Sequence, residues 1–168
     1  KFGIWMEPGM VNEASDLYRE HPDWALVIPG RRPNRSRYQL VLDFSRKEVV
    51  DYIYEKICAV LDQGNVEYVK WDMNRSLADI YSATADSQGR VLHDYVLGLY
   101  DFLARLVDRY PVFPIEGCSG GGGRFCEGML SYTTQRRSSD NTDLIDRPEI
   151  LYGTYFTYTV SSVAAPVP

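Results

Sequence analysis

The segment Tyr68-Val69-Lys70-Trp71-Asp72-Met73-Asn74-Arg75 begins as an aromatic and β-branched run and ends in a cluster of charged and amide side chains. Gly64-Asn65, just before it, is a turn signal that closes a helical pattern. Together they predict a strand that carries polar groups at its carboxyl end. In an α/β barrel this end of the strands holds the active site, so Asp72 is the first candidate catalytic residue.

Helical and strand patterns alternate on both sides of this segment. Apolar residues recur at helical spacing in residues 49–61, after a capping-box pair formed by Ser45 and Glu48, and again in residues 91–107. The other expected elements are strands at 2–6, 112–115 and 129–134, a helix at 12–21 capped by Asn12, and a helix that begins near Pro148. Such βα units imply a parallel sheet with right-handed crossovers, either in an open doubly wound sheet or in a (β/α)₈ barrel. A complete barrel needs about 250 residues, so a barrel would be only partly contained in 168.

The composition is typical of a soluble globular protein, with 45% hydrophobic and 24% charged residues. A net charge of −5 and a pI near 5.0 argue against nucleic-acid binding, and no window is apolar enough for a membrane span. A small or neutral molecule is therefore the expected partner. Cys58, Cys118 and Cys126 fit neither a disulfide framework nor a zinc site, so no metal is expected and the cytoplasm is the expected compartment.

A glycine-rich segment, Cys118-Ser119-Gly120-Gly121-Gly122-Gly123-Arg124, follows the predicted strand 112–115. Backbone amides at such a turn can bind a phosphate. The spacing does not match a P-loop, because Gly123 and Arg124 stand where Lys and Ser or Thr are needed. We favour a wall without side chains that lets a ligand approach the backbone closely, with a ligand-free flexible turn as the other interpretation.

Histidine-assisted nucleophiles are disfavoured by the sequence. Cys118 or Ser139 would need a histidine base, and the two histidines, His21 and His93, lie away from the predicted strand ends. Carboxylates are therefore the better candidates for catalysis.

Asp72 and Asp140 each follow a predicted strand and lie 68 residues apart, about two βα units of a barrel. Two carboxylates that converge from strand ends suit glycoside hydrolysis, in which one attacks the anomeric carbon or activates water and the other protonates the leaving oxygen. Lys70 lies on the same side of the strand as Asp72 and favours its ionised form, hence a nucleophile. Taken alone, either Asp could equally be a helix cap or an ion-pair member.

The assignment of Asp140 as the acid has one opposing observation. Arg136 and Arg137 are close to it in sequence and would oppose its protonation if they pointed inward. Asp143 and Glu7 are therefore kept as alternative acids. Asp43, directly before the capping-box pair, is interpreted as a structural carboxylate.

Three motifs in order, residues 70–75, 118–125 and 139–143, resemble the α-galactosidases of glycoside hydrolase family 36. The resemblance extends to residues 3–8 and 39–43 and so covers nearly the whole chain. It implies a (β/α)₈ TIM barrel and retaining hydrolysis of terminal α-galactosyl residues from oligosaccharides such as melibiose or raffinose, without a cofactor. It also implies that Asp72 is the nucleophile, that Asp140 is the acid/base, and that the galactose pocket is lined by Trp5, Arg37, Lys70, Asn74, Cys118 and Gly120.

The resemblance also places the chain within a barrel, from about the third to the start of the seventh βα unit. Residues 1–168 would then be part of a single catalytic domain, and the family's N-terminal β-sandwich and first barrel strands would lie outside this chain. A partial barrel exposes unpaired sheet edges, so these residues alone are expected to be inactive. The full-length protein is expected to be a homo-oligomer that acts on an α-galactoside.

Three positions depart from the family pattern. Arg137 stands where Trp is usual, Cys126-Glu127 where an Asp-containing pair is frequent, and Pro166 where His is common. The change at Arg137 would alter how the leaving group is held. Two alternatives therefore stay open: a catalytically inert or carbohydrate-binding barrel relative, and a related α-glycosidase or galactosyl transferase.

Overall fold

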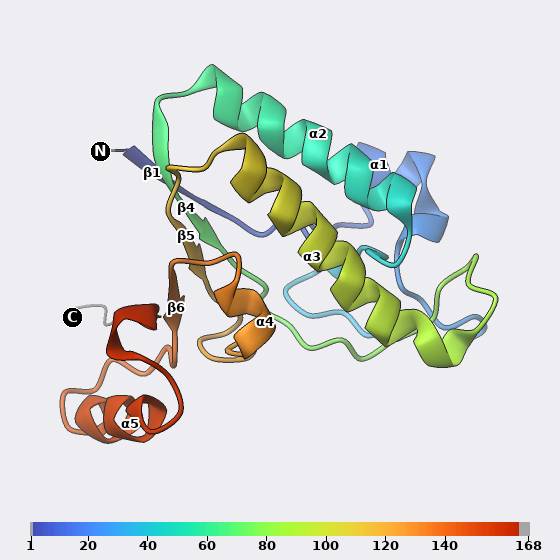
Figure 1. The fold of residues 1–168 in the computed structure, drawn as a ribbon. Helices are drawn as coiled ribbons and strands as arrows, with labels where there is room; N and C mark the ends of the chain where they lie inside the picture. Colours follow the sequence, from blue (N-terminus) through green and yellow to red (C-terminus); the bar gives the residue numbers. More distant parts are fainter. Residues whose placement is uncertain (1, 165–168) are drawn as a thin grey trace. The chain divides into compact units, whose positions relative to one another are not determined.

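The computed structural model describes residues 2–164 and contains a parallel sheet of five strands (Figure 1). The strands follow one another in chain order without reversal, as they do around an α/β barrel and unlike in a doubly wound sheet. This order confirms the predicted fold class, part of an α/β barrel. The strands are β1 (Phe2–Met6), β4 (Val66–Trp71), β5 (Ile115–Gly117), β6 (Gln135–Arg137) and β7 (Val163–Ala164).

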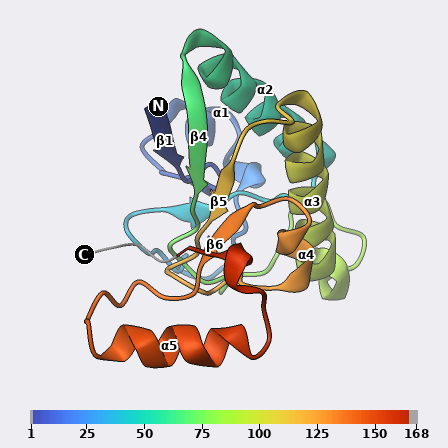
Figure 2. The ribbon, with the colours of Figure 1, turned by 60° about the vertical axis from the view of Figure 1, so that its left-hand side comes forward.

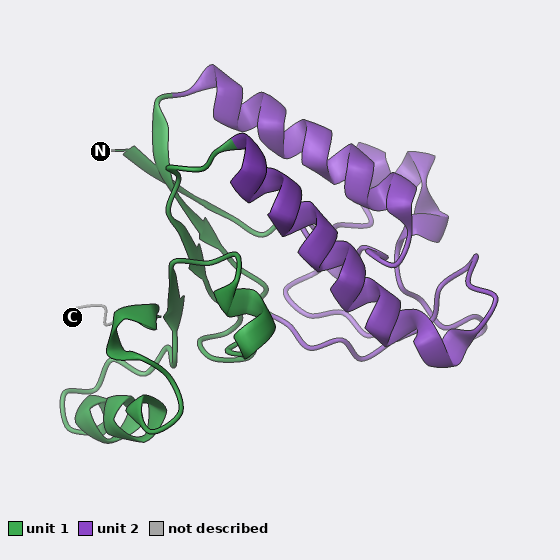
Figure 3. Ribbon diagram, viewed as in Figure 1, with its two compact units in different colours: residues 1–7, 65–74, 110–168 green, residues 8–64, 75–109 purple. Residues whose placement is uncertain are grey.

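The chain divides into two compact units (Figure 3). The first contains the residues up to Glu7, Asn65–Asn74 and the chain from Tyr110 onward, and so holds the parallel sheet. The second contains Pro8–Gly64 and Arg75–Arg109. It holds the long helices α2 (Lys47–Gln63) and α3 (Val91–Arg109), the short helix α1 (Asp16–Glu20), and an antiparallel pair of strands, β2 (Met10–Val11) and β3 (Leu40–Val41).

Strand β4 has two faces of different character. Val69 and Trp71 are buried, whereas Tyr68 and Lys70 alternate with them on the other face. Figure 2 shows β1, β4, β5 and β6 side by side in the sheet. The register pairs Lys70 with Glu116 of β5, and Glu116 with Gln135 of β6. Polar side chains therefore form a row across one face of the sheet.

The predicted strands 112–115 and 129–134 were both placed too early. Val112 is 93% exposed and lies in a turn, and the strand begins only at Ile115. Residues 129–134 instead contain the end of helix α4 (Glu127–Leu130) and a turn, in which the Thr133 amide donates to the Met129 carbonyl at 3.0 Å. The polar segment Gln135–Arg137 forms the strand.

Two predicted helix caps were also wrong. Helix α1 is capped by Ser15, whose hydroxyl accepts from the Tyr18 amide at 3.2 Å, rather than by Asn12. Helix α2 has Arg46 at its N-cap with no side-chain cap, because the Ser45 hydroxyl donates to the carboxylate of Asp43 instead. Asp43 is fully buried, as its interpretation as a structural carboxylate requires.

The two long helices follow the predicted apolar patterns and pack against each other. Phe44 stacks on Tyr95 and Phe102 of α3, with ring centroids 5.7 and 6.1 Å apart. Gly98 of α3 lies so close to the Phe44 carbonyl that a Cβ would overlap it. Helix α5 (Asp146–Tyr155) forms where predicted. Within residues 2–164, no helix is both long and apolar enough to cross a lipid bilayer.

Candidate active site

The carboxyl ends of β1, β4 and β5 bring Trp5, Asp72 and Cys118 together. The Asp72 amide donates to the Met6 carbonyl at 2.9 Å, and the Cys118 amide donates to the Trp71 carbonyl at 2.8 Å. These bonds continue the sheet ladder one residue beyond β4 and β5. The predicted crowding of functional groups at the strand ends is therefore built by backbone pairing.

The Asp72 carboxylate is buried and receives several donors. The Trp5 indole donates to Oδ2 at 3.0 Å and the Met73 amide to Oδ1 at 2.8 Å, and the side chains of Asn74 and Cys118 also donate to the carboxylate. Burial alone would raise the pKa of Asp72, but these hydrogen bonds lower it below the ordinary value. Asp72 is therefore held ionised, as a nucleophile must be.

Cys118 is the neutral donor of this group. Burial raises the pKa of its thiol to about 11, so the thiol keeps its proton at neutral pH. It can therefore donate to Asp72, and it is not a thiolate nucleophile. This agrees with the prediction, which disfavoured Cys118 as a nucleophile.

Lys70 acts differently from the prediction. It lies two residues before Asp72 on the same face of β4, but its Nζ is 3.9 Å from Oε1 of Glu116. Hydrogen bonds, more than the Lys70 ammonium, account for the lowered pKa of Asp72. Asn74 takes part twice, since its side chain donates to Asp72 and its backbone amide donates to the Glu7 carboxylate.

The glycine loop lies directly against the segment that carries Asp140. Gly120 and Gly121 have φ of +52° and +82°, a left-handed conformation that favours glycine. A Cβ at Gly121 would lie 2.7 Å from the Asp140 amide nitrogen and 2.9 Å from Cα of Ser139. A Cβ at Gly120 would meet nothing within 4 Å. The loop thus supports Asp140 with backbone and leaves an open wall at Gly120.

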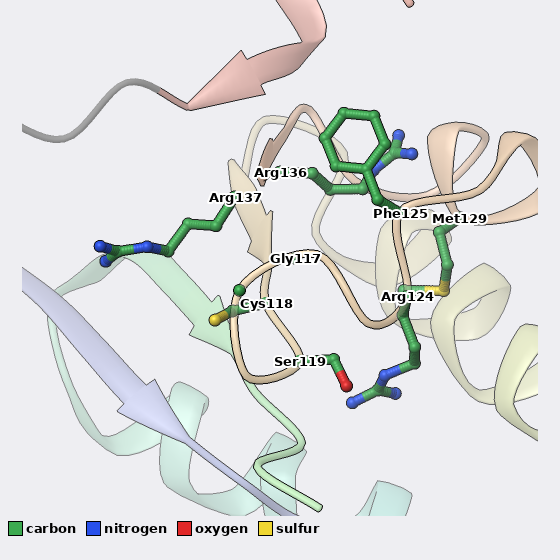
Figure 4. A pocket seen from close by; sticks show the side chains of 9 residues that line it. Gly117, Cys118, Ser119, Arg124, Phe125, Met129, Arg136 and Arg137 are labelled. Carbon is green, nitrogen blue, oxygen red and sulfur yellow. The ribbon is translucent and has the colours of Figure 1, made fainter. Parts of the chain in front are cut away.

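Arg136 and Arg137 point to opposite sides of β6 (Figure 4). Arg136 is buried, and its Nε donates to the Thr133 hydroxyl at 2.7 Å while Nη1 donates to the Cys126 carbonyl at 2.8 Å. Arg137 extends to the side of Cys118, and its Nε lies 3.2 Å from Oδ1 of Asp140. Of the two predicted neighbours, only Arg137 therefore lies beside Asp140, whose side chain is 55% exposed.

Figure 4 also shows a small pocket at the glycine loop, lined in part by Cys118, Ser119 and Arg137. The side chains of Ser119 and Arg124 point toward one another at its edge. The Ser119 hydroxyl donates to the Met73 carbonyl at 2.8 Å, which ties the loop to the end of β4. The lining of the pocket also includes Gly117, Phe125, Met129 and Arg136.

The alternative acids have structural partners. Oδ1 of Asp143 accepts from the amides of Ile145 and Asp146 at 2.8 and 3.1 Å, and these bonds lower its pKa. Glu7 accepts from the Asn74 amide. Asp140 is thus the remaining candidate for the acid. Among residues 2–164, no group of three or more His, Cys, Asp or Glu side chains is placed to hold a metal ion.

Arg37 is the one predicted site residue that belongs to the second unit. It forms a two-residue turn with Tyr38, closed by the Gln39 amide, which donates to the Ser36 carbonyl at 3.0 Å. Arg37 and Tyr38 both have positive φ, of 53° and 60°, as a type I′ turn requires. Asn12 holds the turn by donating to the Tyr38 carbonyl at 2.8 Å. Such strain in non-glycine residues is most often found at functional sites.

Two residues of the site face were missed from the sequence. The Tyr68 hydroxyl donates to Oε2 of Glu116, which also faces Lys70. Glu116 precedes Cys118 by two residues, and Tyr68 precedes Asp72 by four, so strand alternation could have placed both on the face of the site.

Of the three departures from the family pattern, two lie in the described part of the chain. Arg137 faces Asp140, as above. Cys126 is the N-cap residue of α4 and Glu127 its first residue, so this pair begins a helix. Pro166 lies outside the described residues.

The chain matches known sequences over its full length. The melibiase family model covers residues 1–168. The bifunctional α-galactosidase/sucrose kinase AgaSK of Mediterraneibacter gnavus is 61% identical over 167 residues, which are 99% of this chain and 17% of that protein. The α-galactosidase Mel36A of Lactobacillus acidophilus is 53% identical over 169 residues, or 99% of this chain and 23% of that protein.

Solved structures give the same result. The galactosidase domain of AgaSK superposes with a TM-score of 0.91 at 61% identity, covering 98% of this chain and 22% of that chain. The GH36 α-galactosidase AgaA from Geobacillus stearothermophilus superposes with a TM-score of 0.94 at 47% identity, covering 98% and 23%. The chain thus spans about a fifth of the length of these relatives. From the family match over all of its residues, the chain belongs to the melibiase family.

Proposed function

We propose that this chain supplies the catalytic strand ends of a retaining α-galactosidase, as part of a longer single (β/α)₈ catalytic domain. The observation that carries the proposal is the buried Asp72 carboxylate, held ionised by four donors at a strand end. The glycine loop packs against the backbone that carries a second carboxylate, Asp140. The relatives named as α-galactosidases support the substrate class.

In the proposed mechanism, an oxygen of Asp72 attacks the anomeric carbon of a terminal α-galactosyl residue. Asp140 protonates the leaving oxygen, so the glycosidic bond breaks as the covalent galactosyl–enzyme bond forms. Asp140 then takes a proton from water, which attacks the anomeric carbon and releases Asp72. Two displacements restore the α configuration of the product. No step requires a cofactor.

The substrate would be bound by the remaining predicted residues. Trp5 is half exposed and can pack against a sugar ring while its indole N–H holds Asp72. The open space at Gly120 lets a sugar approach the backbone. We propose that galactose hydroxyls bind to the polar groups of Lys70, Asn74 and Cys118.

The stereochemistry of the product tests this mechanism. The full-length protein is expected to release α-galactose first from 4-nitrophenyl α-galactoside, as followed by proton NMR before mutarotation. Release of β-galactose as the first product would contradict retention and the role of Asp72 as the nucleophile. A distance between the Asp72 and Asp140 carboxyl groups of about 5–5.5 Å in a complex would give independent support.

Replacing Trp5 with phenylalanine is expected to move the acidic limb of kcat/KM to higher pH. The change removes a donor to the Asp72 carboxylate, so the pKa of Asp72 rises and the nucleophile becomes protonated at a higher pH than in the wild type. The pH dependence of kcat/KM measures this. Trp24→Phe is the matched control, because the Trp24 ring stacks on His21 and bonds no carboxylate. An acidic limb that moves equally in both variants would contradict the assignment.

A second candidate function is carbohydrate binding without turnover. Oδ1 of Asp140 lies 3.2 Å from Nε of Arg137, so a leaving group would compete with this ion pair for the carboxylate. Calorimetry that detects galactose binding while 4-nitrophenyl α-galactoside stays intact would favour this candidate. Product analysis at high acceptor concentration would separate hydrolysis from galactosyl transfer, the other alternative.

We further propose that the full-length protein acts in the cytoplasm as a homo-oligomer. Cys58, Cys118 and Cys126 are thiols and not disulfides, which suits a reducing compartment. Light scattering after size-exclusion chromatography tests the oligomer, and a purely monomeric species would overturn it. Fractionation of the native cells tests the compartment.

A further inference from the structure

Glu116 lies at the centre of a polar cluster that the mechanism above does not use. It is the register partner of Lys70 on the neighbouring strand, so both side chains project from the same face of the sheet. Its two carboxylate oxygens have different partners: Oε1 lies 3.9 Å from the Lys70 ammonium, and Oε2 accepts from the Tyr68 hydroxyl. The Glu116 and Lys70 side chains are only 15% and 24% exposed. The carboxylate is thus held between a fixed donor and a cation.

The Tyr68 hydroxyl is a permanent donor in this cluster. Burial and the bond to Glu116 raise the pKa of Tyr68, so its proton remains in place at any working pH. Tyr68, Lys70 and Asp72 follow one another on the same face along β4 and its carboxyl end, and Tyr68 is the farthest from that end. The phenol therefore fixes Glu116 from the side opposite to the catalytic carboxylate.

A partner that restrains the Lys70 side chain would reduce the entropy that the side chain loses when a ligand binds to it. A lysine has three donors on a flexible four-carbon stem, and an unpartnered ammonium loses considerable rotamer entropy when a ligand fixes it. The charge of Lys70 also acts on the Cys118 thiol, so the ammonium lies within electrostatic range of the group around Asp72. At 3.9 Å from Glu116 the ammonium is held by charge and not by a hydrogen bond, so its three donors remain available to a ligand.

We propose that Glu116, braced by Tyr68, is a positioning residue that orients the Lys70 ammonium toward the galactosyl group bound above it. The proposal rests on the proposed function, in which Lys70 binds a galactose hydroxyl. Glu116 acts through Lys70 and does not itself touch the substrate.

Glu116→Gln in the full-length protein tests the proposal. It is expected to raise the KM for 4-nitrophenyl α-galactoside, and the Kd for D-galactose in calorimetry, by about tenfold, with kcat changed by less than about threefold. A loss of folded protein would lower the apparent kcat and leave KM unchanged, so the two effects are separable. Tyr68→Phe keeps the ring, removes only the hydroxyl, and is expected to raise KM by about threefold.

The decisive measurement repeats Glu116→Gln in a Lys70→Met background. If Glu116 acts through Lys70, the second substitution causes no further rise in KM or Kd. An equal rise in both backgrounds, or an unchanged KM in Glu116→Gln alone, overturns the proposal. Glu67→Gln is the matched control, because Glu67 is on the same strand but lies at a register irregularity with β1, outside the stretch that pairs with β5, and its KM should equal that of the wild type. Galactose binding without turnover would contradict the proposed function alone, since the Kd comparison still tests Glu116.

Discussion

Replacement of Asp72 by glycine is expected to lower kcat of the full-length protein toward α-galactosides by about 10⁴-fold or more. Without the carboxylate, no group can form the covalent galactosyl intermediate. The folded structure should persist, because the site is at a strand end and glycine fits the space of a deleted side chain. The measurement is steady-state hydrolysis of 4-nitrophenyl α-galactoside, with circular dichroism to verify folding.

Azide should restore turnover in this variant by taking the place of the lost side chain. Its attack on the anomeric carbon forms a C–N bond as the glycosidic C–O bond breaks, and the product is β-galactosyl azide. Asp86→Gly is the control, because Asp86 is exposed in a loop of the second unit, and it should retain wild-type activity. Substantial turnover of the Asp72→Gly variant without added azide would reject Asp72 as the nucleophile.

Replacement of Gly121 by alanine is expected to lower kcat by about 100-fold, because a displacement of about 1 Å in a catalytic group has an effect of this size. The new Cβ would lie 2.7 Å from the Asp140 amide nitrogen, so the backbone that carries the acid/base must shift. Because Gly121 has a positive φ, the alanine should also reduce the free energy of unfolding by about 1–2 kcal/mol. Kinetics and chemical denaturation measure the two effects separately.

Alanine substitutions at two other glycines with positive φ separate the effect of backbone strain from the effect of displacing Asp140. Gly30→Ala, in an open loop of the second unit, has the same backbone penalty with no atom within 4 Å, so kcat should be unaffected. Gly120→Ala should raise KM more than it lowers kcat, since its Cβ enters the open wall proposed for the sugar. If Gly121→Ala behaved like Gly30→Ala, the glycine loop would have no part in placing Asp140.

The fold could be predicted where periodicity and burial agree. Helices α2 and α3 have broad apolar stripes, and β4 has a clear apolar start, so these elements were found in the sequence. Strand β6 could not be found in this way, because Gln135–Arg137 contains only polar residues. It is a strand because the sheet on either side pairs with its backbone, which is a tertiary effect. The apolar residues before it form a helical turn instead.

The proposed catalytic pair was found from the sequence, whereas the side chains that support it were overlooked. Asp72 and Asp140 follow strands and carry recognisable motifs. Glu116 was missed because a single carboxylate inside a short strand has the same sequence pattern as a surface ion pair. The turn at Arg37 and Tyr38 was missed because its residues have none of the Asn-Gly preference of type I′ turns, so only the backbone reveals it.

Because Arg136 and Arg137 are adjacent in β6, the chemistry of the site depends on the register of this strand in the sheet. A slip by one residue would exchange the two faces, sending Arg137 among the buried groups and Arg136 toward the substrate. The bonds of Arg136 to Thr133 and Cys126 are possible in only one alignment. The bonds of the buried Arg136 thus fix the register of β6. The register in turn determines which of the two guanidinium groups lies beside Asp140.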